Sequence, residues 1–284
     1  MDHTLNRILW SLATSYVILR VAQLFPLPLL LVVALSVLLP LAFTLLHGSR
    51  TYGWRAMLLF CALGLLVGNG MENLSIATGF PFGHYYFTAE MGPKVFQVPI
   101  ALGLAYLGIG YLSWTIGAVL VCPGRIVLIP LVATTCMVAW DAAMDPAWGT
   151  VLRLWVWRDG GPYFGVPLSN FAGWFLTVYI FFQLFALGLT LPVFHQSGPH
   201  NTPQSDRQAI IFYLSCALGN ALLMAATRGV AGLANPVTRT VIDPTGKLWH
   251  VENIALVSAL VSLFIMGGLA VWALICLNPR PNSA

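Results

Sequence analysis

Charged residues are scarce in this sequence of 284 residues, and their scarcity excludes several classes of protein. Only 8% of the residues are Asp, Glu, Lys or Arg, whereas soluble globular domains carry about 25%. The net charge is +4, and the sequence contains no run of Lys or Arg of the kind that binds nucleic acid or an anionic lipid surface. We therefore expect no nucleic-acid partner. Polar stretches long enough to form a further domain are also missing, so we expect one domain over residues 1–284.

Paired or clustered cysteines are missing as well. The five cysteines stand singly in or beside apolar stretches, which argues against disulfides and against a clustered metal site. Isolated cysteines of this kind are usually small buried hydrophobic residues, and we expect no bound metal. They are Cys61, Cys122, Cys136, Cys216 and Cys276.

Hydrophobic residues are abundant instead. They make up 58% of the chain, whose mean hydropathy is +0.83. About 20 apolar residues are needed for a helix to cross the bilayer core. Stretches of that length predict eight spans, near residues 8–24, 27–47, 54–72, 98–121, 125–144, 167–193, 207–227 and 252–277.

The fold class that follows is all-α, a polytopic transmembrane helix bundle. The first span is the weakest of the eight, because Arg20 interrupts it and Pro26 and Pro28 follow at once. It could instead lie along the membrane interface. We expect a multi-pass integral protein of the cell (inner) membrane, in contact with membrane lipids.

Three loops predicted on the same side of the membrane differ from the others. Residues 73–97, 145–166 and 228–251 are longer than the loops opposite and rich in Gly, Pro, Tyr, Trp and His. Two of them share a pattern, Gly-x-x-Phe-Gly after an acidic residue and then Val-Pro before the next span. Either a duplication or a common way of re-entering the membrane explains it. Loops held by a rigid bundle often carry function.

Acidic residues stand where these loops meet the membrane. Asp141 and Asp145 are four apart, so on a helix they lie one turn apart on the same face, with Glu72 predicted at the same side. A carboxylate at membrane depth costs about 2.5–3.5 kcal/mol. Repulsion and loss of water should leave at least one member protonated, which makes the pair a Brønsted acid. Alternatively, Asp145 caps a helix or pairs with Arg153 or Arg158.

Aromatic residues gather around the acids. Trp and Tyr also form interfacial belts, which explains part of the cluster. Their π faces stabilise cations, however, by around 2 kcal/mol when water is excluded. Carboxylic acids beside aromatic walls suit the protonation of an unactivated alkene and the shelter of the carbocation formed. The cluster comprises Trp140, Trp148, Trp155, Trp157, Tyr163, Phe164 and Trp174, with Phe82, Tyr85, Tyr86 and Phe87 from the earlier loop.

Several motifs together resemble one family. Glu72 is followed by Thr78-Gly79-x-Pro81-Phe82-Gly83-x-Tyr85 and Val98-Pro99; then come Asp141-x-x-x-Asp145-Pro146, Trp155-x-Trp157 and Gly161-x-Tyr163-x-Gly165-Val166-Pro167-x-x-Asn170-x-x-Gly173-Trp174. Residues 70–175 in this way resemble the membrane-integral carotenoid biosynthesis proteins, which include hydratases of bacterioruberin precursors and of γ-carotene. The resemblance implies addition of water across the terminal double bond of a linear or ψ-end carotenoid, without a cofactor.

Regiochemistry suggests a role for each candidate. Protonation of the less substituted alkene carbon leaves a tertiary cation, which water captures. We expect Asp145 to be the acid, Asp141 to keep it protonated, and Glu72 with Asn170 to position the water. Asn170 could instead cap its own helix. The residues expected to bind substrate are Tyr85, Trp155, Trp157, Tyr163 and Trp174.

Two other functions use the same residues. A terpenoid or carotenoid isomerase or cyclase would form the same cation and quench it differently. A non-enzymatic, proton-coupled lipid carrier would use the acids as relay groups. The expected partners are a carotenoid or isoprenoid lipid substrate and other enzymes of the carotenoid pathway. His84 could relay protons, and Glu252 could complete a site of three carboxylates.

Overall fold

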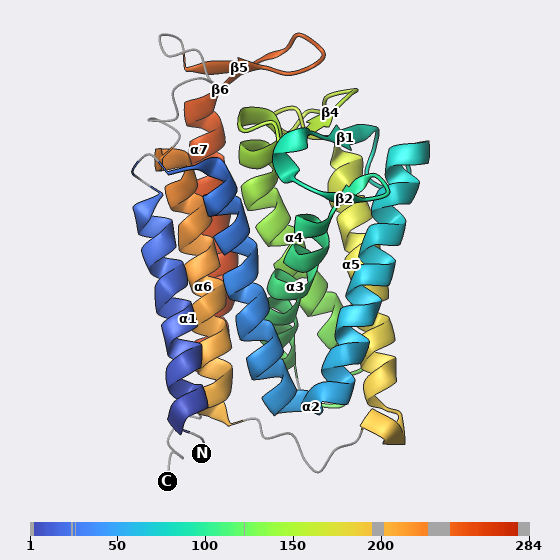
Figure 1. The fold of residues 1–284 in the computed structure, drawn as a ribbon, viewed down its shortest axis with the longest axis vertical. Coiled ribbons are helices and arrows are strands. Elements are labelled where there is room, and N and C mark those ends of the chain that lie inside the picture. The colour runs from blue at the N-terminus through green and yellow to red at the C-terminus, as the bar shows by residue number, and fades with distance from the viewer. Residues whose placement is uncertain are drawn as a thin grey trace.

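The computed structural model describes residues 3–23, 25, 27–121, 123–194, 202–226 and 239–277, which form a helical bundle (Figure 1). Cys122 and residues 228–238 of the third predicted loop lie outside the described residues. The long helices are α1 (His3–Ala22), α2 (Leu29–Thr78), α3 (Ile100–Leu120), α4 (Leu128–Asp145), α5 (Leu168–Leu189), α6 (Pro203–Ala226), α7 (Val251–Leu260) and α8 (Gly267–Leu277).

Short elements complete the architecture. One π-helical turn, Pro146–Val151, continues α4, and a second, Val261–Met266, joins α7 to α8. Two 3₁₀ turns cover Ala89–Met91 and Pro192–Phe194. The strands are β1 (Tyr85–Phe87), β2 (Lys94–Val95), β3 (Val98–Pro99), β4 (Trp155–Trp157), β5 (Thr240–Ile242) and β6 (Leu248–His250).

The bundle confirms the all-α class, and each stretch predicted to span contains a helix. The 50-residue α2 leaves helical geometry at Gly53, with φ 80° and ψ 157°, so two predicted spans form its two arms. Glycine tolerates this backbone because it has no Cβ. Among the described residues, five helices are long and apolar enough to cross a membrane: Leu30–Thr78, Ile100–Leu120, Leu128–Val151, Leu168–Leu189 and Val251–Leu277. The count of eight spans stays a prediction.

Helix α1 stands in the bundle beside α6 and does not lie across it (Figure 1). Its buried residues are Leu9, Ala13, Tyr16, Leu19 and Arg20, a helical stripe that faces its neighbours. The alternative of an interfacial first helix is therefore not supported. Arg20, which made this segment doubtful in the sequence, is on the buried face.

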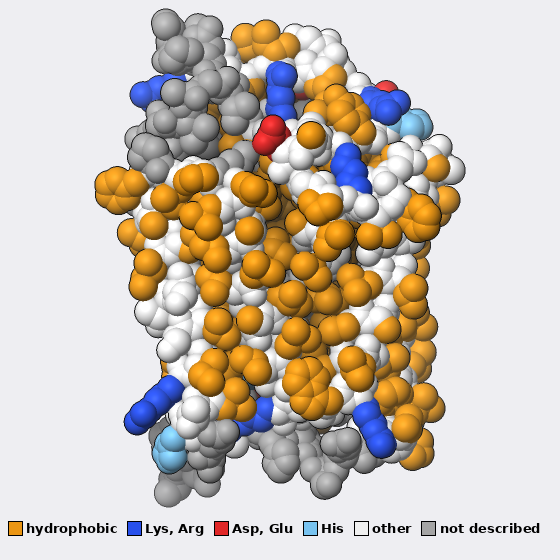
Figure 2. Space-filling view, viewed as in Figure 1, with side chains coloured by type: hydrophobic (Ala, Val, Ile, Leu, Met, Phe, Trp, Pro, Cys, Tyr) orange, Lys and Arg blue, Asp and Glu red, His pale blue; other side chains and the backbone are white. Residues whose placement is uncertain are grey.

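The surface is that of a membrane protein. On the face drawn in Figure 2, hydrophobic side chains cover the middle of the molecule, while charged side chains lie toward its two ends. Large apolar residues such as Leu66 and Phe264 are 73% and 74% exposed. A contiguous apolar surface of this kind is unfavourable in water and suits lipid tails.

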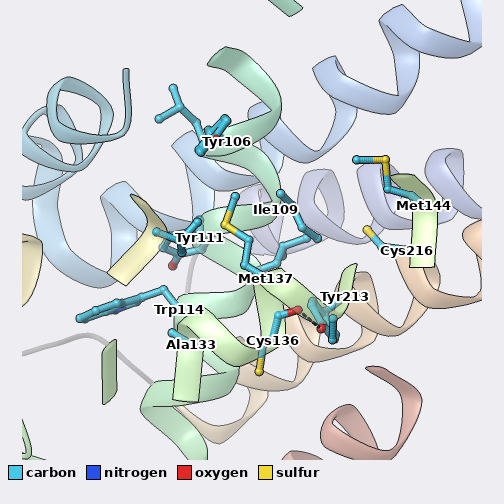
Figure 3. Packing of buried hydrophobic residues seen from close by; sticks show 14 of the residues in the cluster. Tyr106, Ile109, Tyr111, Trp114, Ala133, Cys136, Met137, Met144, Tyr213 and Cys216 are labelled. Atoms are coloured by element: carbon cyan, nitrogen blue, oxygen red, sulfur yellow. Dashed lines mark hydrogen bonds between the residues drawn. The ribbon is translucent and has the colours of Figure 1, made fainter. Parts of the chain in front are cut away.

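The interior between α3, α4 and α6 is packed with large side chains (Figure 3). The Tyr213 hydroxyl donates to the Cys136 carbonyl at 2.7 Å, so this buried polar atom has its acceptor. Cys136 and Cys216 are buried and unpaired, and Cys61 and Cys276 are also free thiols. The expectation of buried cysteines is confirmed for Cys136 and Cys216 and is wrong for Cys276, which is exposed.

The two similar loops meet in space. β1 pairs antiparallel with β4, and the β5–β6 hairpin lies at the same end of the bundle, opposite the bend of α2 (Figure 1). The loops that the sequence places on one side of the membrane therefore do share one end, as far as they are described. The β1–β4 pair covers the ends of α2 and α4, where the acidic residues are.

Candidate active site

Four polar side chains that the sequence singles out converge beneath the β1–β4 pair. Glu72 lies in the last two turns of α2, Asp141 and Asp145 lie one turn apart in α4, and Asn170 lies in the first turn of α5. Glu72 is 3% exposed and the other three are 1% exposed. All four line the same cavity. Buried polar groups of this kind need hydrogen-bond partners, and the partners define the site.

Asn170 bridges the two aspartates. Its Nδ2 donates to Asp141 Oδ2 at 2.9 Å and to Asp145 Oδ2 at 2.7 Å. Helix α5 follows Pro167, and no side-chain hydrogen bond caps it. The alternative in which Asn170 caps its own helix is therefore wrong. The amide instead fixes the spacing of two carboxyl groups that would otherwise repel each other when both are ionised.

Asp145 has further donors from β4. Trp155 Nε1 lies 2.7 Å from Asp145 Oδ1, and Trp157 Nε1 lies 3.4 Å from the same oxygen. Residues two apart on a strand face the same side, so one short strand supplies both indoles. With Asn170, three N–H donors reach this carboxyl group.

The alternative partners proposed for Asp145 lie elsewhere. The Arg153 guanidinium donates to the Ile242 carbonyl at 2.9 Å. Arg158 lies over the Tyr86 ring, 5.6 Å from its centroid. Neither arginine forms an ion pair with Asp145 among the described residues. The aspartate is held by neutral donors inside the protein.

Gly149 permits this arrangement, although nothing in the sequence distinguishes it. It lies in the π-helical turn that follows Asp145. A Cβ at this position would be 2.7 Å from Trp155 Nε1 and 3.1 Å from Asp145 Oδ1. The close approach of indole and carboxylate therefore requires a residue without a side chain here. Such π-helical turns inside helices often accompany functional sites.

Glu72 accepts two tyrosine hydroxyls. Tyr106 donates to Glu72 Oε1 at 2.8 Å, and Tyr85 donates to Oε2. Burial first, and then the nearby Glu72, raise the pKa of Tyr85 well above its usual range. The Tyr85 hydroxyl therefore keeps its proton and remains a donor. Sequence reasoning missed Tyr106, because a tyrosine inside an apolar span carries no distinguishing signal.

Aromatic side chains close the cavity. The register pairs Tyr85 with Trp157 and Phe87 with Trp155, and all four side chains are buried. The Tyr85 and Trp157 ring centroids are 4.7 Å apart. Trp174 of α5 stacks on Tyr106, with centroids 4.7 Å apart and 10° between the planes. Four of the five residues expected to bind substrate therefore line the cavity.

Tyr163 is the exception. Its hydroxyl donates to the Ala142 carbonyl at 2.9 Å, and its ring packs on Phe171. Burial raises the pKa of Tyr163 to about 12, so the hydroxyl stays protonated in this hydrogen bond. Tyr163 is not among the residues that line the carboxylate cavity. Its contacts brace the loop against α4 instead.

The cavity is small. Its volume is about 20 Å³, and a single water molecule needs about 10–15 Å³ by the same measure. The space thus admits one water among the carboxyl groups, and the aromatic side chains must move apart for a lipid chain to enter. The lining residues are Glu72, Phe82, Tyr85, Phe87, Leu102, Asp141, Met144, Asp145, Trp155, Trp157, Asn170 and Trp174.

Two other ionisable candidates lie away from this cavity. Glu252 is exposed and pairs with Arg239 at 2.9 Å, so the alternative in which it completes a site of three carboxylates is wrong. His84 is exposed and pairs with Asp159 at 2.9 Å, outside the cavity. Among the described residues, no three His, Cys, Asp or Glu side chains are grouped as metal ligands.

Fold and site together define a class: a helical membrane protein with buried carboxyl groups, aromatic walls and space for one water. More particularly, the chain belongs to the family of carotenoid biosynthesis proteins, whose sequence model matches residues 28–243. The chain is also similar to bisanhydrobacterioruberin hydratase of Haloarcula japonica, with 27% identity over 139 residues. This alignment covers 47% of this chain and 46% of that protein. The match spans about half the length of this curated relative. No solved structure matches. Both likenesses support a carotenoid-modifying activity.

Proposed function

We propose that this protein is a carotenoid hydratase, a hydro-lyase that needs no cofactor. It adds water across the terminal double bond of a linear or ψ-end carotenoid through a tertiary carbocation. The observation that carries the proposal is the water-sized cavity enclosed by Glu72, Asp141 and Asp145 beneath an aromatic wall. It combines the proton source, the place for water and the shelter for a cation.

The hydrogen-bond donors favour Asp141 as the acid. Asp145 accepts three N–H groups, whereas the one donor to Asp141 among the described residues is Asn170. Donors of this kind stabilise an ionised carboxylate more than a neutral acid. When the two neighbouring carboxyl groups hold one proton between them, these donors therefore leave it mainly on Asp141. This exchanges the two roles expected from the sequence.

The remaining groups act on the cation and the water. Proton transfer from Asp141 to the less substituted alkene carbon forms a C–H bond and leaves a tertiary cation. The carboxylate of Asp145 and the faces of Trp155 and Trp157 stabilise its charge. Glu72, oriented by Tyr85 and Tyr106, holds the water and accepts its proton as the C–O bond forms. Return of that proton to Asp141 closes a redox-neutral cycle.

The alternatives share the first step and differ in the second. An isomerase or cyclase must keep water away from the cation, whereas this cavity has room for one water among carboxyl groups. A proton-coupled carrier would place its site near the membrane midplane. The carboxyl groups here lie near one end of the bundle, under the β1–β4 pair (Figure 1). Both observations favour hydration.

The membrane arrangement belongs to the same proposal. We propose that all eight predicted segments cross the cell (inner) membrane as one domain, with the two arms of α2 counted separately. The substrate then reaches the site from the lipid phase, where carotenoids dissolve. Other enzymes of the carotenoid pathway would exchange substrate and product with it through the same membrane.

Expression in a lycopene-accumulating host tests the function. The full chain should convert part of the lycopene to a more polar pigment that carries a tertiary hydroxyl group. Asp141→Asn should abolish this pigment, whereas Glu252→Gln, an exposed position outside the cavity, should leave it unchanged. A pigment isomeric with lycopene, formed without added oxygen, would instead identify an isomerase or a cyclase.

A further inference from the structure

A second cavity adjoins the carboxylate cavity. It lies between α1, α2, α3, α4 and α6, and its volume is about 50 Å³, compared with about 20 Å³ for its neighbour. Leu102, Met144 and Trp155 line both cavities. Figure 3 shows Met144 of α4 and Cys216 of α6, which both line the second cavity. A lipid chain with its alkene end at the carboxyl groups would extend into this space.

Three buried N–H donors without partners belong to residues that line the second cavity. They are Arg20 Nε, Trp148 Nε1 and Asn220 Nδ2, none of which has an acceptor among the described residues. Buried donors usually have acceptors, and a buried donor without one costs about 1–3 kcal/mol. Three of them around one cavity, on α1, the π-helical turn after α4, and α6, indicate a ligand that supplies lone pairs.

Arg20 is the strongest of the three donors. It is 5% exposed and donates to Gln23 Oε1 at 3.2 Å and to the Tyr16 hydroxyl. No carboxylate pairs with it among the described residues. Its guanidinium packs against Gly219 of α6, where a Cβ would be 2.5 Å from Arg20 Cδ and 2.7 Å from Arg20 Nε. Helix α6 therefore leaves space for this side chain to lie along the cavity.

We propose that the second cavity binds an oxygen atom carried by the lipid substrate, a hydroxyl or carbonyl group a short distance along the chain from the alkene. This rests on the proposed function, because the shared wall places the oxygen and the alkene of one molecule in adjoining cavities. The apolar side chains around the donors, such as Val33, Val37 and Ile109, suit the hydrocarbon chain that would carry this oxygen, and the shared lining residues connect it to the alkene in the first cavity. The preferred substrate is then a polyene that an earlier hydroxylation, hydration or oxidation has already supplied with oxygen.

Binding without turnover tests the inference. The full-length Asp141→Asn protein in detergent is titrated with lycopene and with a derivative that carries one hydroxyl group a few carbons from a retained terminal alkene, and the polyene absorption band reports the bound fraction. The hydroxylated polyene should bind at least about tenfold more tightly, which is the effect of one hydrogen bond to a charged donor. Adding Arg20→Met should remove this preference and leave lycopene binding unchanged.

Two further variants distinguish a loss of the oxygen site from misfolding of the Arg20→Met protein. Gly219→Ala keeps Arg20 but displaces it, and alanine favours the helix, so this change should also reduce the preference in a folded protein. Thr134→Val removes a buried hydroxyl that has no partner among the described residues and does not line the cavity, so it should leave the binding preference unchanged.

Equal binding of the two polyenes would overturn the inference, as would an anionic phospholipid that occupies the cavity and displaces both. Its failure is distinct from that of the proposed function. A protein that hydrates lycopene without any preference refutes only the oxygen site. A protein that prefers the hydroxylated polyene but hydrates neither refutes only the reaction.

Discussion

Asp141 and Asp145 have the same chemistry but different surroundings, and the proposed roles rest on that difference. Asp141→Asn keeps the shape of the side chain and its contact with Asn170 but cannot donate a carboxylic proton. We expect product formation to fall by at least about a hundredfold, the low end of general acid catalysis. Asp145→Asn should cost less, because the substituted amide still accepts the indole hydrogen bonds. Initial rates with purified variants measure both.

The inserted amount of each variant is the control for these rates. A larger loss for Asp145→Asn than for Asp141→Asn would return the acid to Asp145. Near-normal rates for both would make the aspartates structural and leave Glu72 as the acid.

Gly149 gives a second test at the residue scale. In Gly149→Ala the new methyl group would lie 2.7 Å from Trp155 Nε1, so the indole must move from Asp145. We expect the rate to fall by on the order of tenfold, about the effect of one lost hydrogen bond, while the protein stays inserted. Gly70→Ala in α2 is the matched control, because no atom beyond its own stretch of helix backbone lies within 4 Å of its added Cβ. Equal rates for the two variants would contradict the role of Gly149.

The sequence predicts the polar residues of the candidate site better than it predicts the residues that hold them in place. Glu72, Asp141, Asp145 and Asn170 are conspicuous because ionisable and amide groups are expensive at membrane depth. Tyr106 is not, because an apolar span accommodates a tyrosine for many reasons. The contact between Gly149 and Trp155 depends on the π-helical turn, and no residue pattern in the sequence predicts that turn.

At the scale of elements, the β5–β6 hairpin braces the segment that follows Asp145. Val241 of β5 packs with Ala147 and Val151 of the π-helical turn. Arg153 donates to the Ile242 carbonyl at 2.9 Å. The hairpin thereby holds the turn that carries Gly149 and leads to β4. Loss of the hairpin's structure should therefore displace this turn and, with it, the residues of the candidate site.

Asp243 makes the hairpin sensitive to acid. Burial acts to raise its pKa, but hydrogen bonds from Thr245, Trp249 and the Lys247 backbone outweigh burial and lower it. A lowered pKa means that the stabilisation is present above the ordinary value of about 3.9 and is lost as pH falls through the lowered value. Proteolysis within residues 240–250 should thus accelerate as the medium is acidified below about pH 4. An acid-active protease applied to the detergent-solubilised protein measures this.

The control for this experiment is Asp243→Asn. It removes the titrating group, so cleavage of the hairpin, relative to that of an unstructured peptide by the same protease, should become nearly independent of pH. At the least acidic pH used it should be faster than in the unsubstituted protein. Identical pH profiles for the two proteins would show that Asp243 does not control the hairpin.

Elements themselves were predictable to different degrees. Long apolar stretches identify the helices, including the two arms of α2, since a span needs a fixed length. The strands are only two or three residues long, too short for an alternating pattern to stand out. The likeness of the two loops does not predict that β1 pairs with β4.

The whole molecule is expected to expose its two ends to opposite sides of the membrane. The segment Leu128–Val151 has 24 residues, about 36 Å of helix at 1.5 Å per residue, enough for a bilayer core of about 30 Å. Arg125 precedes it and Asp159 follows it, and both are exposed. Cysteines placed there by Arg125→Cys and Asp159→Cys should be labelled from opposite sides by an impermeant thiol reagent.

The chain's own cysteines provide the background for the labelling. Intact and opened vesicles are compared, and each substituted cysteine should react from one side alone. Labelling of both positions from the same side would contradict the crossing by α4.

The central claim is that buried carboxyl groups add water to a polyene, and the source of the new atoms tests it most directly. Purified protein is incubated with a ψ-end carotenoid in water labelled with heavy oxygen and deuterium, without added metal, flavin or nicotinamide. The account predicts a tertiary alcohol with one heavy oxygen on the more substituted carbon and one deuterium on its neighbour. A product isomeric with the substrate, or an oxygen derived from air, would contradict it.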